Sequence, residues 1–232
     1  VTPEFSGLQG SVAFSAANET SAQTSASTAQ KPRLWSMGLN YTNGPLGVGF
    51  GFERHVGYNA FAVTSAGSGA AFTEGTDSSY QLGAGYTFMG GALRVNALWA
   101  RLKYNQTIST IGSTDQNLQQ TNWNLNGEWK VSGPHSVRLG YTKNGTSTGT
   151  VGTTAAPVMI GGILGNGGAG NTGAQKYSFE YAYAMSKRTE LSLGYAKVNN
   201  DSAANQTVGT GATSPGFGES QSYIGLRAKH SF

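Results

Sequence analysis

The last ten residues, YIGLRAKHSF (Tyr223–Phe232), alternate between apolar and polar side chains. One row is mainly apolar and consists of Ile224, Leu226, Ala228, His230 and Phe232. The other row is mainly polar or charged and consists of Tyr223, Gly225, Arg227, Lys229 and Ser231. Successive side chains of a β-strand point to opposite faces, so this segment is predicted to be a strand with one apolar and one polar face.

The same alternation recurs along the chain, in runs of about 9–11 residues, the length of a tilted membrane-spanning strand. The predicted strands cover 8–16, 33–42, 46–55, 79–88, 92–104, 122–131, 135–144, 175–185, 189–199 and 223–232. Tight turns such as Asn43-Gly44 alternate with long polar loops. This rhythm predicts an all-β fold, a transmembrane antiparallel β-barrel with short periplasmic turns and long extracellular loops. Residues 1–232 are expected to form a single domain.

Composition supports this interpretation. The hydrophobic fraction of 38% is below the roughly 45–50% of globular proteins, which leaves little apolar sequence for a soluble core. Regularly spaced aromatic residues and a net charge of +4 argue against disorder. With no cysteine, the chain has no disulfides, thiol chemistry or Cys-based zinc sites. A soluble β-sandwich remains the alternative, although it would not favour the regular alternation of long and short connections.

Three stretches resemble the general porins of β-proteobacteria, of the Burkholderiales type, to which the neisserial porins are similar. They are TPEFSGLQGSVAF (Thr2–Phe14), GAQKYSFEYAYAMSKRTELSLGYAKVNN (Gly173–Asn200) and the closing YIGLRAKHSF. The resemblance covers the whole chain. It implies a homotrimer of sixteen-stranded, water-filled barrels, integral to the bacterial outer membrane and surrounded by its lipids.

The resemblance aligns this chain with the last ten strands of such a barrel. Six N-terminal strands and the inward-folded third loop are therefore expected to precede Val1 in a longer protein, and Val1 does not begin a signal peptide. Phe232 resembles the terminal aromatic residue that the barrel assembly machinery reads in this family.

If the apolar rows face lipid, seven large side chains are predicted to point outward: Trp35, Phe50, Tyr86, Leu125, Leu139, Phe179 and Leu193. Ten charged residues of the opposite rows are predicted to line the pore: Glu53, Arg94, Glu128, Lys130, Arg138, Lys176, Glu180, Glu190, Arg227 and Lys229. The set holds six basic and four acidic side chains, which predicts a weak preference for anions. Solvated strand ends and structural ion pairs remain alternative roles for individual members.

Nothing in the sequence indicates catalysis or a cofactor. Gly165–Gly170 matches a dinucleotide-binding glycine pattern, but it lies in a predicted loop without a following helix. The histidines do not have metal-ligand spacing: His55 and His135 are expected to be solvated near strand ends, and His230 to lie at headgroup level. Asp77, Asp115 and Asp201 are expected in loops, away from a matching histidine cluster. Dispersed basic residues argue against nucleic-acid binding.

Two functions follow from a barrel of this kind. The first is a passive channel for ions and small hydrophilic solutes, driven by their gradients. The second is a non-conducting barrel that serves as an adhesin or a structural anchor through its loops. Inward rows rich in Gly, Ser, Asn and Ala leave room for water and favour the channel.

Overall fold

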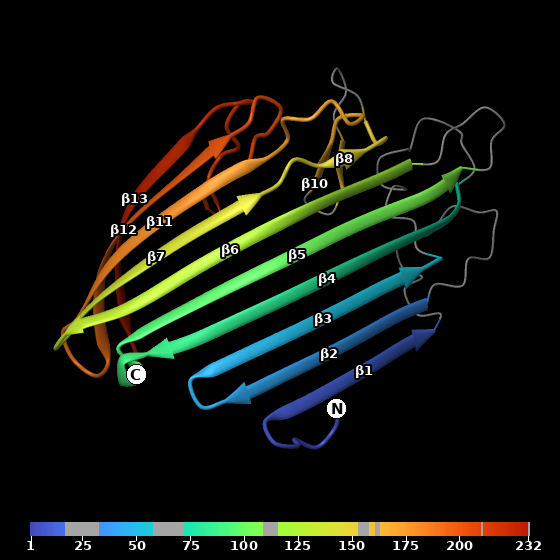
Figure 1. The fold of residues 1–232 in the computed structure, drawn as a ribbon. Coiled ribbons are helices and arrows are strands. Elements are labelled where there is room, and N and C mark those ends of the chain that lie inside the picture. The colour runs from blue at the N-terminus through green and yellow to red at the C-terminus, as the bar shows by residue number, and fades with distance from the viewer. Residues whose placement is uncertain are drawn as a thin grey trace.

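The computed structural model describes residues 1–16, 33–57, 72–108, 116–152, 158–160, 163–209 and 211–231. Within them, ten long strands form one antiparallel sheet in chain order (Figure 1), with a short strand, β8, paired to β6. The ten are β1 (Leu8–Ala16), β2 (Arg33–Asn43), β3 (Leu46–Val56), β4 (Phe72–Phe88), β5 (Leu93–Ile108), β6 (Gln116–Ser132), β7 (His135–Asn144), β11 (Ala174–Ala184), β12 (Thr189–Asn200) and β13 (Gln221–His230). β1 and β13 are the edges of this sheet, and β11–β13 curve away from the plane of β1–β6. The predicted all-β antiparallel fold is confirmed.

Tight turns connect the strands at one end of the sheet. Gly44 and Gly133 have φ values of 53° and 55°, a left-handed conformation that glycine adopts without steric cost. A 3₁₀ turn, Met89–Gly91, joins β4 to β5. Between β11 and β12, the Ser186 hydroxyl accepts hydrogen bonds from the backbone N–H groups of Arg188 and Thr189. These local sequences hold neighbouring strands in register.

The register gathers the apolar side chains on one face of the sheet. Leu82 pairs with Phe50 and with Trp99, and Trp99 pairs with Trp123 on the next strand. Directly opposed residues lie on the same face, so all seven residues predicted to point outward share it. Many of them are exposed, with Leu139 at 58% and Leu125 at 49%. We call this the outward face, because so large an apolar surface requires apolar surroundings.

No helix in the described part of the chain is long and apolar enough to cross a membrane.

Three strands extend further toward the long loops than the sequence predicted. β4, β5 and β6 contain 17, 16 and 17 residues, and Asp77 lies inside β4 instead of in a loop. Polar cross-strand pairs such as Thr76–Asn105 and Asn105–Asn117 continue the ladder there. Apolar and polar residues no longer alternate in these extensions, so the pattern carried no signal for them.

The connection between β7 and β11 is folded, although the sequence predicted a continuous loop. It contains β8 (Thr148–Gly149), β9 (Val158–Ile160) and β10 (Ile163–Gly165), and β9 pairs with β10. Val151 and Ile163 pack on Leu118 of β6, together with Leu102 and Tyr104 of β5. These strand residues lie on the face opposite to the outward face.

A second apolar cluster anchors the connection between β12 and β13. Val208 packs on Ala174 and Val198, which also belong to the face opposite to the outward face. The Asn200 side chain donates to the Gln206 carbonyl at 3.0 Å, and the Val208 N–H donates to Gln221 Oε1 at 2.9 Å. Both long connections therefore fold over this second face, at the end of the sheet away from the tight turns.

Candidate functional site

All ten residues predicted to line a pore lie on the face opposite to the outward face, which we call the inward face. Register links four of them in one line across neighbouring strands: Arg94 pairs with Glu128, Glu128 with Arg138, and Arg138 with Glu180. Glu190 pairs with Lys229 on β13, and the remaining members follow by alternation along their strands. Eight of the ten lie in the half of the sheet nearer the tight turns, whereas Glu53 and Lys176 lie nearer the long loops.

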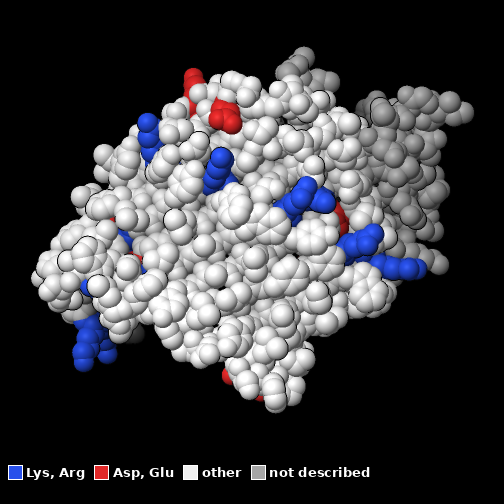
Figure 2. Space-filling view, in the orientation of Figure 1, with Lys and Arg blue, Asp and Glu red and all other residues white. Residues whose placement is uncertain are grey.

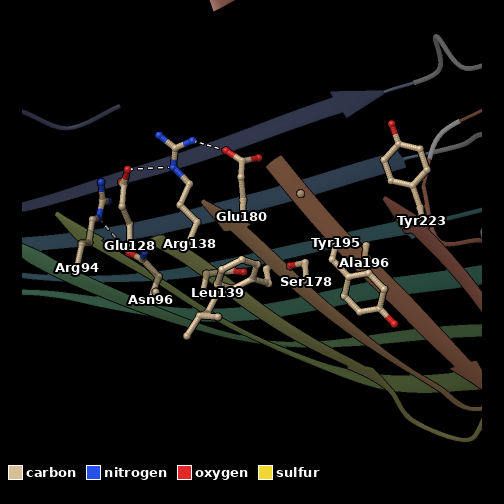
Figure 3. Close-up of a pocket in the computed structure, with 14 residues that line it drawn as sticks. Arg94, Asn96, Glu128, Arg138, Leu139, Ser178, Glu180, Tyr195, Ala196 and Tyr223 are labelled. Carbon is tan, nitrogen blue, oxygen red and sulfur yellow. Dashed lines mark hydrogen bonds and ion pairs between the residues drawn. The ribbon is translucent and has the colours of Figure 1, made fainter. Parts of the chain in front are cut away.

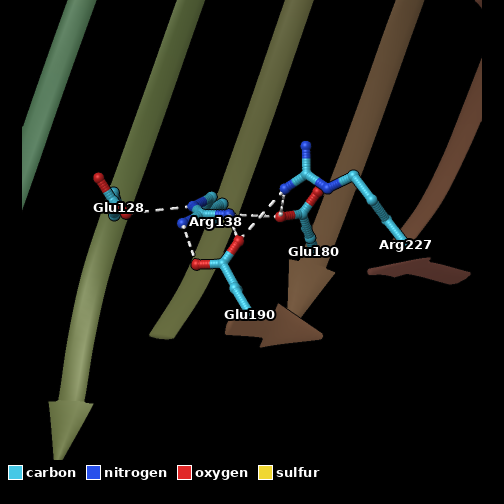
Figure 4. Close-up of polar contacts among 5 residues, drawn as sticks. All are labelled: Glu128, Arg138, Glu180, Glu190 and Arg227. Carbon is cyan, nitrogen blue, oxygen red and sulfur yellow. Dashed lines mark hydrogen bonds and ion pairs between the residues drawn. The ribbon is translucent and has the colours of Figure 1, made fainter. Parts of the chain in front are cut away.

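Five of these residues form one ion-pair network (Figure 4). Arg138 is at its centre: Nε lies 3.1 Å from Glu128 Oε1, Nη2 lies 3.1 Å from Glu190 Oε2, and Nη1 contacts Glu180. Arg227 Nη2 lies 3.1 Å from Glu180 Oε1 and 3.4 Å from Glu190 Oε1. The network crosses β6, β7, β11, β12 and β13 and ties five consecutive strands together at one level.

The network is partly shielded from solvent. The Arg138 side chain is 33% exposed, and Glu180 and Glu190 are 28% and 26% exposed. Water screens such pairs incompletely, so they contribute more than isolated surface pairs but less than fully buried ones. The network contains two arginines and three glutamates, and its members largely neutralise one another. Five of the ten predicted residues therefore have a structural role in addition to any effect on ions.

The four basic residues of the predicted set that lie outside this network form no ion pair among the described residues, although Lys229 lies opposite Glu190 in the strand register. They are Arg94, Lys130, Lys176 and Lys229. Arg94 Nε donates to Asn96 Oδ1 at 3.2 Å, and both side chains line a cavity of about 490 Å³ with Glu128 and Arg138 (Figure 3). Together these four side chains give the inward face a local excess of positive charge.

A second polar cluster lies near the long-loop end of the inward face. His55 Nε2 is 3.0 Å from Glu53 Oε1, and His55 Nδ1 is 3.0 Å from Asp77 Oδ1. Leu102 and Tyr104 line the same small cavity. The prediction that His55 is merely solvated was wrong, since its side chain is 22% exposed between two carboxylates. Glu53 and His55 are two residues apart on one strand, so the sequence already indicated that both side chains point to the same face.

The glycine-rich stretch and the two remaining histidines take no part in these inward-face clusters. Gly165–Gly170 begins at the last residue of β10 and continues into a turn without a helix. In this turn the Asn166 side chain donates a hydrogen bond to the Gly170 carbonyl at 2.7 Å. His135 and His230 belong to the outward rows, and His135 Nδ1 lies 2.6 Å from the Tyr181 hydroxyl. Among the described residues, no three His, Asp or Glu side chains are arranged to hold a metal ion. Phe232 and Asp115 lie outside the described residues.

Similar structures share this architecture. The anion-selective porin from Comamonas acidovorans is 21% identical with a TM-score of 0.67, and the match covers 100% of this chain and 57% of that chain. Two structures of OmpT from Vibrio cholerae, both 13% identical, have TM-scores of 0.59 for a loop L8 deletion mutant and 0.55 for a trimer form. These matches cover 98% and 86% of this chain, and 60% and 56% of the OmpT chains. The chain thus spans less than two thirds of each.

An antiparallel sheet with an apolar outward face and a charged inward face defines an integral β-barrel protein of a membrane. Residues 1–203 match the family described as Gram-negative porin, and the chain belongs to that family. It is therefore an integral protein of the bacterial outer membrane. Among curated proteins, none matches this sequence.

Proposed function

We propose that the protein is a non-enzymatic channel through which ions and small hydrophilic solutes diffuse across the outer membrane. The observation that carries the proposal is the segregation of charge: every predicted pore-lining residue lies on the inward face. Small residues accompany these charges, with Asn40 opposite Gly49 and Ser178 opposite Gly140. A non-conducting adhesin or anchor would need a filled lumen, which the cavity of about 490 Å³ beside Arg94 does not favour.

The complete pore would be a sixteen-stranded barrel that forms a single domain, and residues 1–232 would contribute its last ten strands. Supporting this, the match to the Comamonas porin covers 57% of that longer chain. A homotrimer is part of the same proposal, because a similar structure from Vibrio cholerae is a trimer form. Phe232 is proposed to serve the barrel assembly machinery as a recognition residue.

A weak anion preference follows from the inward charges. The network holds two arginines and three glutamates and is close to neutral, so the positive excess of the ten residues comes from Arg94, Lys130, Lys176 and Lys229, which lie outside it. Positive charge near a low-dielectric wall raises the local concentration of anions. Screening over a Debye length of roughly 8–10 Å keeps the effect modest in a wide lumen and weakens it at higher salt.

Reversal potentials across planar bilayers under a salt gradient test this proposal. The complete protein should show a small anion-selective potential that decreases with salt. Arg94→Gln with Lys130→Gln should lower the anion preference, because both charges face the lumen without a carboxylate partner. Lys187→Gln with Arg188→Gln removes the same charge from the β11–β12 turn and serves as the control, with a smaller expected effect. Cation selectivity at low salt, or equal effects of the two pairs, would contradict the assignment.

A further inference from the structure

A band of neutral polar side chains lies on the inward face, between the ion-pair network and the two folded connections. Its side chains are amides and hydroxyls of β5, β6, β7 and β11. We call the set the neutral band, and its members are Asn96, Asn122, Asn124, Asn126, Thr142, Asn144 and Ser178. Three of the asparagines follow one another along β6, two residues apart, and span roughly 13 Å of the wall.

The strand register brings three members of the band to one cavity. Asn96 pairs with Asn126, and Ser178 lies at the same level two strands further on. These three side chains line the cavity of about 490 Å³ beside Arg94, and Tyr223 lines it from β13. In Figure 3, Arg94 and Tyr223 lie at the two ends of this group of side chains, with Ser178 between them. One cavity thus combines amide and hydroxyl groups with an aromatic ring.

Glycines allow the amides of the band to lie close against the wall. A Cβ atom at Gly85 would stand 2.6 Å from Asn96 Oδ1, and one at Gly140 would stand 3.0 Å from Asn126 Oδ1. A side chain at either glycine would therefore displace the amide that lies over it. An amide that is positioned in advance loses less conformational entropy when it binds a solute.

The band has hydrogen-bonding capacity beyond its internal contacts. Asn124 Nδ2 donates to Thr142 Oγ1 at 2.7 Å, and Asn126 Nδ2 donates to Asn124 Oδ1. Each amide has two N–H donors and two lone pairs, so these contacts use only part of what the side chains offer. Asn122 Oδ1 is buried and has no hydrogen-bond partner among the described residues. Buried acceptors are nearly always satisfied, so this atom points to a donor on a bound molecule.

Tyr223 supplies an aromatic surface at the end of the band. It pairs with Ala196, which places it on the inward face. Its ring lies over Gly225, where a Cβ atom would stand 2.6 Å from Tyr223 Cε1, and its side chain is 59% exposed. An exposed ring can pack against the apolar C–H face of a sugar, while the hydroxyls at the edge of the sugar reach the amides.

Absence of charge alone does not distinguish the band from the outward face. Figure 2 shows a broad surface without charged side chains, and large exposed residues of the outward face such as Leu125 and Leu139 are apolar. Such a surface favours hydrocarbon. The members of the neutral band are also uncharged, but each of them can both donate and accept hydrogen bonds. The band therefore suits a neutral solute that is rich in hydroxyl groups.

We propose that the neutral band and Tyr223 form a binding track for neutral carbohydrates that pass through the lumen. A sugar hydroxyl donates and accepts hydrogen bonds, as the asparagine side chains do, so it can bridge two members of the band. An anionic solute would instead be drawn to Arg94 and Lys176, which border the band. A short peptide would also need apolar contacts, which the members of the band do not provide. The proposal rests on the proposed channel, because the solute reaches the band through the lumen.

Single-channel currents of the complete protein in planar bilayers, recorded with maltotriose in solution, test the proposal. We expect maltotriose to interrupt the ion current in a saturable way. A polyethylene glycol of the same hydrodynamic size carries hydroxyl groups only at its ends, so it should lower the current without saturation.

Variants assign the binding to the band. Asn124→Ala with Asn126→Ala should weaken maltotriose binding about 25-fold, since each lost hydrogen bond corresponds to roughly a factor of five. The matched control, Asn105→Ala with Asn199→Ala, removes two amides from the outward face and should bind as the wild type does. Tyr223→Leu keeps an apolar side chain without the flat ring, so it should also weaken binding and serves as an independent test.

Several results would overturn the proposal. Equal maltotriose binding by the Asn124/Asn126 double variant and the control would remove the band from recognition. Equal effects of maltotriose and polyethylene glycol would show that size alone accounts for the interruption. Equal interruption by triglycine would show that the band does not select carbohydrates.

The same recordings separate this proposal from that of the channel. Absence of any ion current would contradict the channel itself, whereas a normal current without saturable interruption would overturn the carbohydrate track alone. Both alanine substitutions in the band leave the charge of the wall unchanged. An unaltered conductance of the double variant without sugar therefore verifies that it is folded, so weakened binding is not a folding defect.

Discussion

Replacing Arg138 with glutamine tests the ion-pair network directly. The substitution removes the contacts to Glu128, Glu180 and Glu190, and it leaves Arg227 as the one cation of the network facing two of those carboxylates. Glutamine retains part of the length and hydrogen-bonding capacity of the side chain. The expected loss of stability therefore comes mainly from charge.

The size of the loss follows from the exposure of the partners. Exposed ion pairs contribute about 0.2–1 kcal/mol each, and unpaired, fully buried charges cost about 3–5 kcal/mol. Arg138 is 33% exposed and Glu190 is 26% exposed. The free energy that the three ion pairs of Arg138 contribute should therefore lie between these two values, closer to that of exposed pairs. We expect the free energy of unfolding to fall by about 1–2 kcal/mol. Because the Debye length shrinks to roughly 3 Å at 1 M salt, the loss should decrease there.

Urea unfolding of the protein in detergent micelles, followed by tryptophan fluorescence, measures this change. Arg94→Gln is the matched control, since Arg94 lies on the same face without an ion pair in the described structure, and its effect should stay within about 0.5 kcal/mol. A double-mutant cycle of Arg138→Gln with Glu190→Gln should give a coupling of about 0.5–1 kcal/mol. Equal losses for Arg138→Gln and Arg94→Gln, or additive effects in the cycle, would refute the reasoning.

Two further predictions concern orientation and assembly. All four tryptophans lie in outward rows. Brominated phospholipid should therefore quench more than half of the tryptophan fluorescence, whereas aqueous iodide should quench little of it. Strong quenching by iodide and weak quenching by brominated lipid would place the apolar face inside the barrel. Deleting Phe232 should lower the yield of folded, outer-membrane protein in cells without lowering synthesis, measured by heat-modifiable gel migration of membrane fractions, and an unchanged yield would exclude a recognition role.

Strand positions were predictable wherever one face met lipid. β1 and β7 begin and end at the predicted residues, because apolar and polar side chains alternate along their full lengths. The extensions of β4, β5 and β6 were not predictable, because apolar and polar residues do not alternate there. Leu118 in the β6 extension is apolar, but it stands alone among polar neighbours and lies on the inward face. The small strands β8–β10 were missed for a different reason. They depend on Val151 and Ile163 meeting Leu118, a contact between residues distant in sequence.

The charged face was predictable as a set, but its internal pairing was not. Alternation places a residue such as Arg138 on the inward face, yet it carries no information about which carboxylate that residue contacts. Glu180 and Glu190 lie 42 and 52 residues from Arg138, and curvature and register bring them together.

The two folded connections and the ion-pair network occupy opposite ends of the inward face. Leu118, which anchors the first connection, and Glu128 lie on the same strand, roughly 33 Å apart at 3.3 Å per residue. That separation is about four Debye lengths at physiological salt, so the charges at one end of the face are screened from the other end. In the proposed channel, the folded connections would select solutes by size, and the charged residues at the other end of the inward face would select them by charge. Mutations that reshape a connection can change which molecules enter while leaving ion preference intact, and selection can tune each property alone.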